Sequence, residues 1–271
     1  MRRAVIKQRI ITAVIALPIL ILCVLYASQG LFAGLLFVIS GLALREFYHM
    51  ALPAERRLES SLSIVAGILC CLGIVYAASP SALLLSIVLP FLLLTLVFLF
   101  RFQDMHKVSR DLAVSLFGLL YIPVLLAHMA LLRALPDGRN WVFLVLLVVM
   151  TSDTMAYFIG MKFGRCSLYE AVSPKKTVEG SIAGLVGSVL GAAICKCWFF
   201  PGLSWLDVML IGIAVGAFSQ LGDLVESLLK RSFGVKDSGS LIPGHGGMLD
   251  RLDSLLFAFP LTYYYAIWVF A

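Results

Sequence analysis

The sequence predicts an all-α, polytopic integral membrane protein of about nine transmembrane helices with its N-terminus in the cytoplasm. Of its 271 residues, 61% are hydrophobic and only 13% are charged, a balance that lies outside the range of soluble globular domains. The apolar residues gather in runs of about 20, the length that a helix needs to cross the hydrocarbon core. Basic residues stand at the ends of these runs and favour one side of the membrane.

Nine such runs follow one another along the chain. They lie at roughly 10–27, 31–48, 62–79, 82–100, 112–132, 141–160, 181–200, 206–229 and 254–270. The first run follows basic residues as a signal peptide would, but it is too long for one, so we expect a retained helix. Connections such as "PDGRN" contain turn-forming residues and leave no room for a soluble domain. We therefore expect one integrated membrane domain: residues 1–140 hold spans one to five, and residues 141–271 hold spans six to nine with a loop at 230–253.

The distribution of charge predicts the orientation. With the N-terminus inside, only Arg133, Arg139 and Lys196 of the 21 Lys and Arg lie on or near the outer side, which leaves 18 inside. This bias predicts a multi-pass protein of the cell (inner, cytoplasmic) membrane with the 230–253 loop in the cytoplasm. It also accounts for the net charge of +6 without a nucleic-acid partner. The six cysteines mostly fall in apolar runs and show no C-x-x-C pair, so we interpret them as small buried hydrophobes.

Carboxylates inside the predicted spans are the first candidate functional groups. An ionised side chain at the centre of a span costs about 3 kcal/mol and should face a cavity, a partner or a metal. Span six contains Asp153 and, four residues later, Tyr157. Four polar residues of span eight share one helical face, because intervals of four, three and four separate Ser219, Asp223, Glu226 and Lys230. A structural Glu226–Lys230 pair is an open alternative for Glu226, whereas Asp223 has no basic residue within one turn.

Two further polar stretches lie between spans. "SPKKTVEGS" (173–181) places Lys175 and Lys176 before a helix start, with Thr177 and Ser181 as candidate caps; lysines and helix N-termini both attract phosphate. "LIPGHGGMLDRLDS" (241–254) combines glycines with two aspartates, Asp250 and Asp253. Carboxylates beside cations, with glycines that allow close backbone approach, are typical of a site for Mg²⁺ and phosphate. Asp223 and Asp250 are the candidate metal ligands.

Three common catalytic motifs are absent from the sequence. It has no G-x-S-x-G of a serine hydrolase, no G-x-x-x-x-G-K-[ST] of a P-loop nucleotidase and no H-E-x-x-H of a zinc protease. These reaction classes are therefore disfavoured.

The C-terminal motifs resemble those of a known family. The run Ser227-x-x-Lys230-Arg231, four residues, Lys236-Asp237, then Pro243-x-His245-Gly246-Gly247-x-x-Asp250-Arg251-x-Asp253 is similar to the signature of the CDP-diacylglycerol synthases (phosphatidate cytidylyltransferases). Asp153-x-x-Ala156-Tyr157-x-x-Gly160 and Ser173-Pro174-Lys175-Lys176-Thr177-x-Glu179-Gly180 resemble motifs of the same family. The first 140 residues match it only as strings of hydrophobic helices.

The resemblance implies a membrane enzyme, a homodimer, that condenses CTP with phosphatidic acid in the bilayer. The products would be CDP-diacylglycerol, for phospholipid synthesis, and pyrophosphate. It implies Mg²⁺ as cofactor, leaves open a second, monovalent cation (K⁺) in the same site, and carries the family's metal-binding aspartates onto Asp223 and Asp250. Residues 141–271 would then be the catalytic region.

The chemistry of phosphoryl transfer indicates a role for each matched residue. A phosphate monoester is anionic at pH 7, since its second pKa is about 6, so positioning and cations matter more than a general base. The expected catalytic residues are Asp223, Asp250, Lys230, Lys236 and Arg251. The expected phosphate or substrate contacts are Ser173, Lys175, Lys176, Thr177, Ser227, Arg231, His245, Gly246 and Gly247. Residues expected to orient a lysine, an arginine or metal-bound water are Asp153, Tyr157, Glu226, Asp237 and Asp253.

Two other functions remain open at this point. A CTP-dependent polyprenol or phytol kinase would also use a nucleotide and a lipid, but the uninterrupted run from Lys236 to Asp253 disfavours it. A cation-coupled transporter would explain the intramembrane carboxylates and leave the 230–253 loop unexplained. Release of pyrophosphate from CTP only when phosphatidate is present would separate these three.

Overall fold

The computed structural model describes the backbone at residues 2–102, 104–242, 244 and 246–270, and side chains from Val14 onward. The all-α membrane architecture is confirmed: within these residues, eight helical segments are long and apolar enough to cross a membrane. They are Gln29–Ala51, Ala54–Val75, Pro80–Phe100, Met105–Ala134, Gly138–Phe163, Val178–Trp198, Trp205–Ser232 and Leu249–Val269. Of helix α1 (Arg2–Tyr26), the part from Val14 to Tyr26 has described side chains. The ninth span and the side of the N-terminus stay predictions.

The chain divides into two compact units. Unit 1 comprises Met1–Leu131 and Asp237–Asp250, and unit 2 comprises Leu132–Lys236 and Arg251–Ala271. The predicted boundary near residue 140 lies close to the first division, but the 230–253 loop is itself divided. Its central part, residues 237–250, belongs with the N-terminal helices. A single integrated membrane domain stays a prediction.

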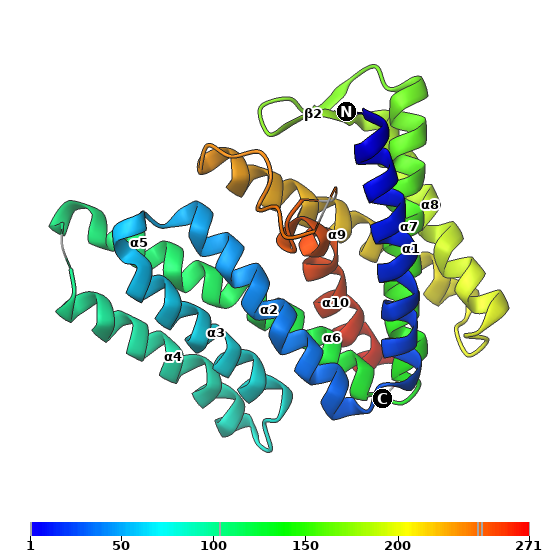
Figure 1. Cartoon of the computed structure of the whole chain (residues 1–271). Helices are drawn as coiled ribbons and strands as arrows, with labels where there is room; N and C mark the ends of the chain where they lie inside the picture. Colours follow the sequence, from blue (N-terminus) through cyan, green and yellow to red (C-terminus); the bar gives the residue numbers. More distant parts are fainter. Residues whose placement is uncertain (1, 103, 243, 245, 271) are drawn as a thin grey trace. The chain divides into compact units, whose positions relative to one another are not determined.

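Helix α3 (Arg57–Val75) lies at the centre of the packing in unit 1. In Figure 1 it lies between α2 (Gln29–Ala51), in blue, and α4 (Pro80–Phe100), in teal, and it contacts both. Helix α4 starts two residues before the predicted span, because the Ser79 hydroxyl accepts from the Ala82 N–H and Pro80 occupies the first turn. The predicted fifth span is α5 (Met105–Leu119), a π-helical turn η2 (Leu120–Val124) that contains Pro123, and α6 (Leu125–Ala134). A proline removes a backbone donor, which accounts for the irregular turn.

A buried ion cluster holds the ends of α3 and α5 together. Arg56, in the short helix η1 (Ala54–Arg56), lies 3.3 Å from the carboxylate of Glu59 and 3.1 Å from that of Asp111. The Arg56 guanidinium also donates to the Arg101 carbonyl at 3.0 Å, and the Arg101 side chain lies 3.5 Å from Glu59. Buried charges of this kind persist only when they are paired.

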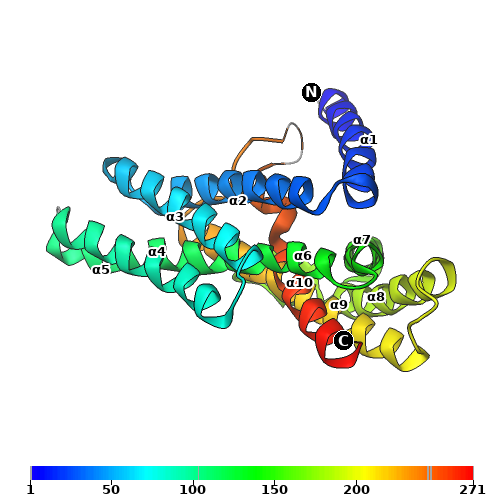
Figure 2. The same cartoon turned by 90° about the horizontal axis from the view of Figure 1, so that it is seen from below.

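Unit 2 is built on three helices packed in chain order. Helix α8 (Val178–Trp198) contacts both α7 (Gly138–Phe163) and α9 (Trp205–Ser232), as Figure 2 shows. Close packing of α8 on α7 requires a missing side chain: a Cβ on Gly187 would stand 2.7 Å from the Thr151 carbonyl oxygen. Helix α9 begins with a capping box, in which Ser204 and Asp207 bond each other's backbone N–H groups. Helix α10 (Leu249–Val269) completes the chain.

A short β-hairpin joins α7 to α8, and the sequence analysis did not predict it. Strand β1 (Ser167–Tyr169) pairs antiparallel with β2 (Ser173–Thr177), with Ser167 opposite Thr177 and Tyr169 opposite Ser173. The hairpin contains the "SPKKT" stretch, so the two adjacent lysines are held on a strand and not on a free loop.

Candidate active site

A cavity of about 550 Å³ lies within unit 2. Its wall is formed by α7, the hairpin, α8 and α9, and it includes six residues that the sequence predicts for the site: Asp153, Tyr157, Lys175, Lys176, Thr177 and Asp223. These residues are up to 70 positions apart in the chain, from 153 to 223. The cavity therefore combines two lysines with two carboxylates in a space large enough for a small-molecule ligand.

The hairpin positions the lysines on this wall. Thr177 caps α8, as predicted, because its hydroxyl accepts from the Gly180 N–H at 3.1 Å. The Glu179 carboxylate accepts from the backbone N–H groups of Arg165 and Cys166 at 3.1 and 3.4 Å, which ties the start of the hairpin to the first turn of α8. The adjoining Lys176 ammonium then lies 2.7 Å from the Asp223 carboxylate.

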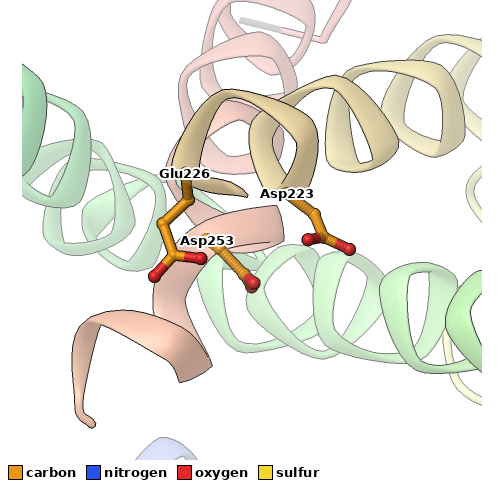
Figure 3. Close-up of side chains that lie close together, drawn as sticks. All are labelled: Asp223, Glu226 and Asp253. Carbon is orange, nitrogen blue, oxygen red and sulfur yellow. The ribbon is translucent and has the colours of Figure 1, made fainter. Parts of the chain in front are cut away.

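Three carboxylates converge beside the cavity. Asp223 and Glu226 project from α9 and Asp253 from α10, and one oxygen of each lies within 4.8 Å of the others (Figure 3). Oxygen ligands at this spacing are those that Mg²⁺ and other hard cations prefer. Only Asp223 of this group also lines the cavity, so it joins the carboxylate cluster to the cavity.

Cations offset the negative charge of the cluster. Lys230 forms an ion pair with Glu226 one turn away on α9, as the structural alternative for Glu226 predicts. Arg251 and Lys176 both interact electrostatically with Asp153, and Lys230 interacts with Asp253. With Asp153 the carboxylates number four, and with Lys175 of the cavity wall the cations also number four, so opposite charges are balanced in number. A metal cation and a polyanion that bind together would keep this balance.

The 237–250 segment forms a compact loop in unit 1. The Asp250 carboxylate is buried and accepts from the backbone N–H groups of Ser238 at 3.0 Å and Gly247 at 2.8 Å. Gly246 has a φ of +85°, and a Cβ there would stand 2.7 Å from an Asp250 oxygen, so a side chain is excluded. The backbone at these glycines closely approaches the Asp250 carboxylate, whereas their contact with a phosphate stays a prediction.

Other predicted site residues lie elsewhere. Asp250 belongs to unit 1 and Asp223 to unit 2, so a metal site shared by these two stays a prediction. Arg231 is exposed and donates to the Val235 carbonyl at 3.0 Å, where it stabilises the turn after α9. Ser227 is buried on α9, Ser173 lies on β2, and Lys236 and Asp237 are exposed. The predicted contact His245 lies outside the described residues.

The sequence analysis missed Glu46, Gln220 and Ser238 near these sites, and Ser181, predicted as a candidate helix cap, lies on the cavity wall instead. On the cavity wall, the Gln220 side-chain amide donates to the Ser181 carbonyl at 3.1 Å, and the Ser181 hydroxyl donates back to it. In unit 1, Glu46 on α2 accepts from Ser238 and from the Leu249 N–H. A carboxylate near the end of an apolar span was the available signal for Glu46; the others gave none.

Known proteins resemble this chain over most of its length. A family model described as "Cytidylyltransferase family" matches residues 7–269. The chain is 36% identical to a phosphatidate cytidylyltransferase of Staphylococcus saprophyticus, covering 94% of this chain and 96% of that protein. It is 32% identical to one of Synechocystis, with 96% of each chain covered, and 42% identical to one of Bacillus subtilis over 47% of each. Similarity therefore extends to the N-terminal helices, beyond the motifs that the sequence analysis used.

Proposed function

Because the chain belongs to the cytidylyltransferase family, we propose that it transfers the cytidylyl group of CTP to phosphatidic acid. The products would be CDP-diacylglycerol, for phospholipid synthesis, and pyrophosphate. The supporting observation is the cavity of unit 2, where Lys175 and Lys176 stand beside Asp223. A nucleotide triphosphate and a phosphate monoester both carry several negative charges, and such a wall is suited to bringing them together.

The bond changes define what the protein must supply. An oxygen of the phosphatidate phosphate forms a bond to the α-phosphorus of CTP, and the bond from that phosphorus to the β-phosphate oxygen breaks. The bond electrons leave with pyrophosphate, and no proton has to be removed from the attacking oxygen, which is ionised at pH 7 because its pKa is about 6. The protein therefore has to hold two anions in line and stabilise the leaving charge.

The residues of the cavity suit these tasks. Lys176 belongs to the wall and is held by Asp223, so an anion in the cavity would meet a lysine that is already oriented. Lys175 is exposed on the same strand and free to follow a bound phosphate chain. Tyr157 is largely exposed on α7 and lines the same space, where its ring offers a flat apolar surface.

The carboxylate cluster fits a divalent cation. Asp223, Glu226 and Asp253 offer only oxygen ligands, within 4.8 Å of one another, and Mg²⁺ binds one or two carboxylates while phosphates and water complete its shell. We propose that Asp223 holds Mg²⁺ with Asp253 or Glu226, and that Asp250 contributes as the family resemblance implies. Bound there, Mg²⁺ would neutralise developing charge on the phosphates. A monovalent cation (K⁺) at the same carboxylates and a homodimeric assembly remain part of the proposal.

An isotope experiment tests the reaction. Protein in vesicles is incubated with Mg²⁺, phosphatidate and CTP labelled on either the α- or the γ-phosphorus, and the lipid extract is counted. We expect the α-label in the lipid and the γ-label in released pyrophosphate, with neither event when phosphatidate is omitted. Entry of the γ-label into lipid would identify a polyprenol-type kinase, and ion flux without CTP turnover would identify a transporter.

A further inference from the structure

Glu46 connects the 237–250 loop to helix α2 within unit 1. One oxygen of its carboxylate, Oε2, accepts from the Ser238 hydroxyl at 3.2 Å and from the Leu249 backbone N–H at 3.0 Å. Ser238 and Leu249 are the two ends of the loop, and Glu46 precedes them by 192 and 203 residues. Figure 2 shows the loop, in orange, beside α2. A single carboxylate therefore closes the loop at both ends.

The loop is shaped to admit this carboxylate. A Cβ on Gly239 would stand 2.6 Å from the other Glu46 oxygen, Oε1, and a Cβ on Gly247 would overlap both Oε2 and the Ser238 hydroxyl. Real Cβ atoms do not come so close, so a side chain at either position would displace the Glu46 carboxylate or the Ser238 hydroxyl. Oε1 is buried and has no hydrogen-bond partner in the described part of the chain. The polar function of Glu46 is thus concentrated on Oε2.

Ser238 carries the connection on to Asp250. Its hydroxyl donates to Glu46 and accepts from the Asp250 backbone N–H at 3.3 Å, while its own N–H donates to the Asp250 carboxylate at 3.0 Å. Ser238 is 3% exposed and Asp250 8% exposed, so water does not substitute readily for these bonds. The position of Asp250 therefore depends on Glu46 through the buried Ser238 and through Leu249, the residue that precedes Asp250.

We propose that Glu46 is a positioning residue for the reaction: its Oε2 holds the loop in the conformation that presents Asp250. This role rests on the proposed function, because Asp250 matters to turnover only if the loop takes part in cytidylyl transfer. In this role Glu46 acts as a hydrogen-bond acceptor, and its negative charge contributes less to the position of the loop than the two hydrogen bonds do.

Three substitutions at one position separate acceptor from charge. Glu46→Gln keeps an oxygen that can accept both bonds, and its amide nitrogen replaces Oε1. Glu46→Asp keeps the charge but withdraws it by one methylene, about 1.5 Å, beyond the range of both donors. We expect kcat/KM for CTP to stay within about threefold for Gln, and to fall roughly ten- to hundredfold for Asp and for Ala. Glu55→Ala is the control, since Glu55 is an exposed carboxylate in the same unit.

A second readout reports on the loop without turnover. Hydrogen exchange of peptides covering 237–250 should speed up in Glu46→Ala and Glu46→Asp, and match wild type in Glu46→Gln, while peptides from α4 stay unchanged in all. Because Ser238 is one of the two groups through which Glu46 acts, the double variant Glu46→Ala/Ser238→Ala should lose less activity than the product of the two single losses. A purely structural role would speed exchange throughout unit 1 and give additive losses.

The outcomes distinguish this role from the proposed function. If wild-type protein makes no CDP-diacylglycerol, the function fails, and the exchange pattern still decides whether Glu46 holds the loop. Activity in the order Asp above Gln would overturn the proposal and make Glu46 a charge-bearing group. Unchanged exchange of the loop in Glu46→Ala would overturn it as well.

Discussion

Asp223 is the residue at which the cavity and the carboxylate cluster of unit 2 meet. It lines the cavity, pairs with Lys176 at 2.7 Å and lies within 4.8 Å of Glu226 and Asp253. Its neighbours on α9 could not indicate the pairing, because Lys176 stands 47 positions earlier on a strand.

We expect Asp223→Asn to lower kcat/KM at least about hundredfold, equivalent to about 2.7 kcal/mol of transition-state stabilisation. The substitution keeps the size of the side chain and removes the charge that would bind Mg²⁺, so the protein should stay folded. Steady-state assays at saturating Mg²⁺ measure the loss, with Glu170→Gln, an exposed carboxylate of the hairpin connection, as control. Near-normal activity would remove Asp223 from the metal site.

Two substitutions of Asp250 separate the effect of its charge from the effect of its hydrogen bonds. One oxygen accepts from both Ser238 and Gly247, and an asparagine oxygen can do the same. We expect Asp250→Asn to abolish turnover with loop exchange unchanged, and Asp250→Ala to abolish turnover with loop exchange accelerated, since buried donors lose their acceptor. Hydrogen exchange beside the assay checks both. An active Asp250→Asn variant would reduce Asp250 to a loop residue.

The ion cluster of η1, α3 and α5 joins three elements of unit 1 through buried charges. Arg56 is 2% exposed and Glu59 fully buried, so removal of Arg56 leaves carboxylates in an apolar surrounding. We expect Arg56→Ala to lower the free energy of unfolding by about 3–5 kcal/mol.

The adjacent Arg57→Ala is the matched control, because Arg57 is exposed, and its effect should stay within about 0.5 kcal/mol. Chemical denaturation in detergent measures both variants. Equal stability of the two would show that the cluster contributes nothing beyond a surface pair.

At the scale of the whole molecule, the charge bias predicts which ends of the helices face the cytoplasm. Cys166, exposed between α7 and α8, should react with a membrane-impermeant maleimide only after permeabilisation. A cysteine introduced by Gly202→Cys, where a Cβ would be in ordinary contact with a Phe200 ring carbon at 4.0 Å, should react in intact cells. The exposed Cys197 is first replaced by serine. Labelling of Cys166 from outside would reverse the orientation and separate the site from cytosolic CTP.

The sequence by itself determined the membrane class and the eight described spans, and it predicted the chemistry of the site. Apolar runs must be helical in lipid, since every backbone group needs an internal partner, and the motif residues carry their chemistry in their types. Thr177 as a cap and the Glu226–Lys230 pair were within its reach because both are local interactions. Only the tertiary structure decided that Lys176 meets Asp223, that Asp253 joins Glu226, and that Glu46 holds a loop 192 residues away. Those contacts depend on how helices pack, and packing is set by close approaches such as Gly187 against Thr151, which no local pattern specifies.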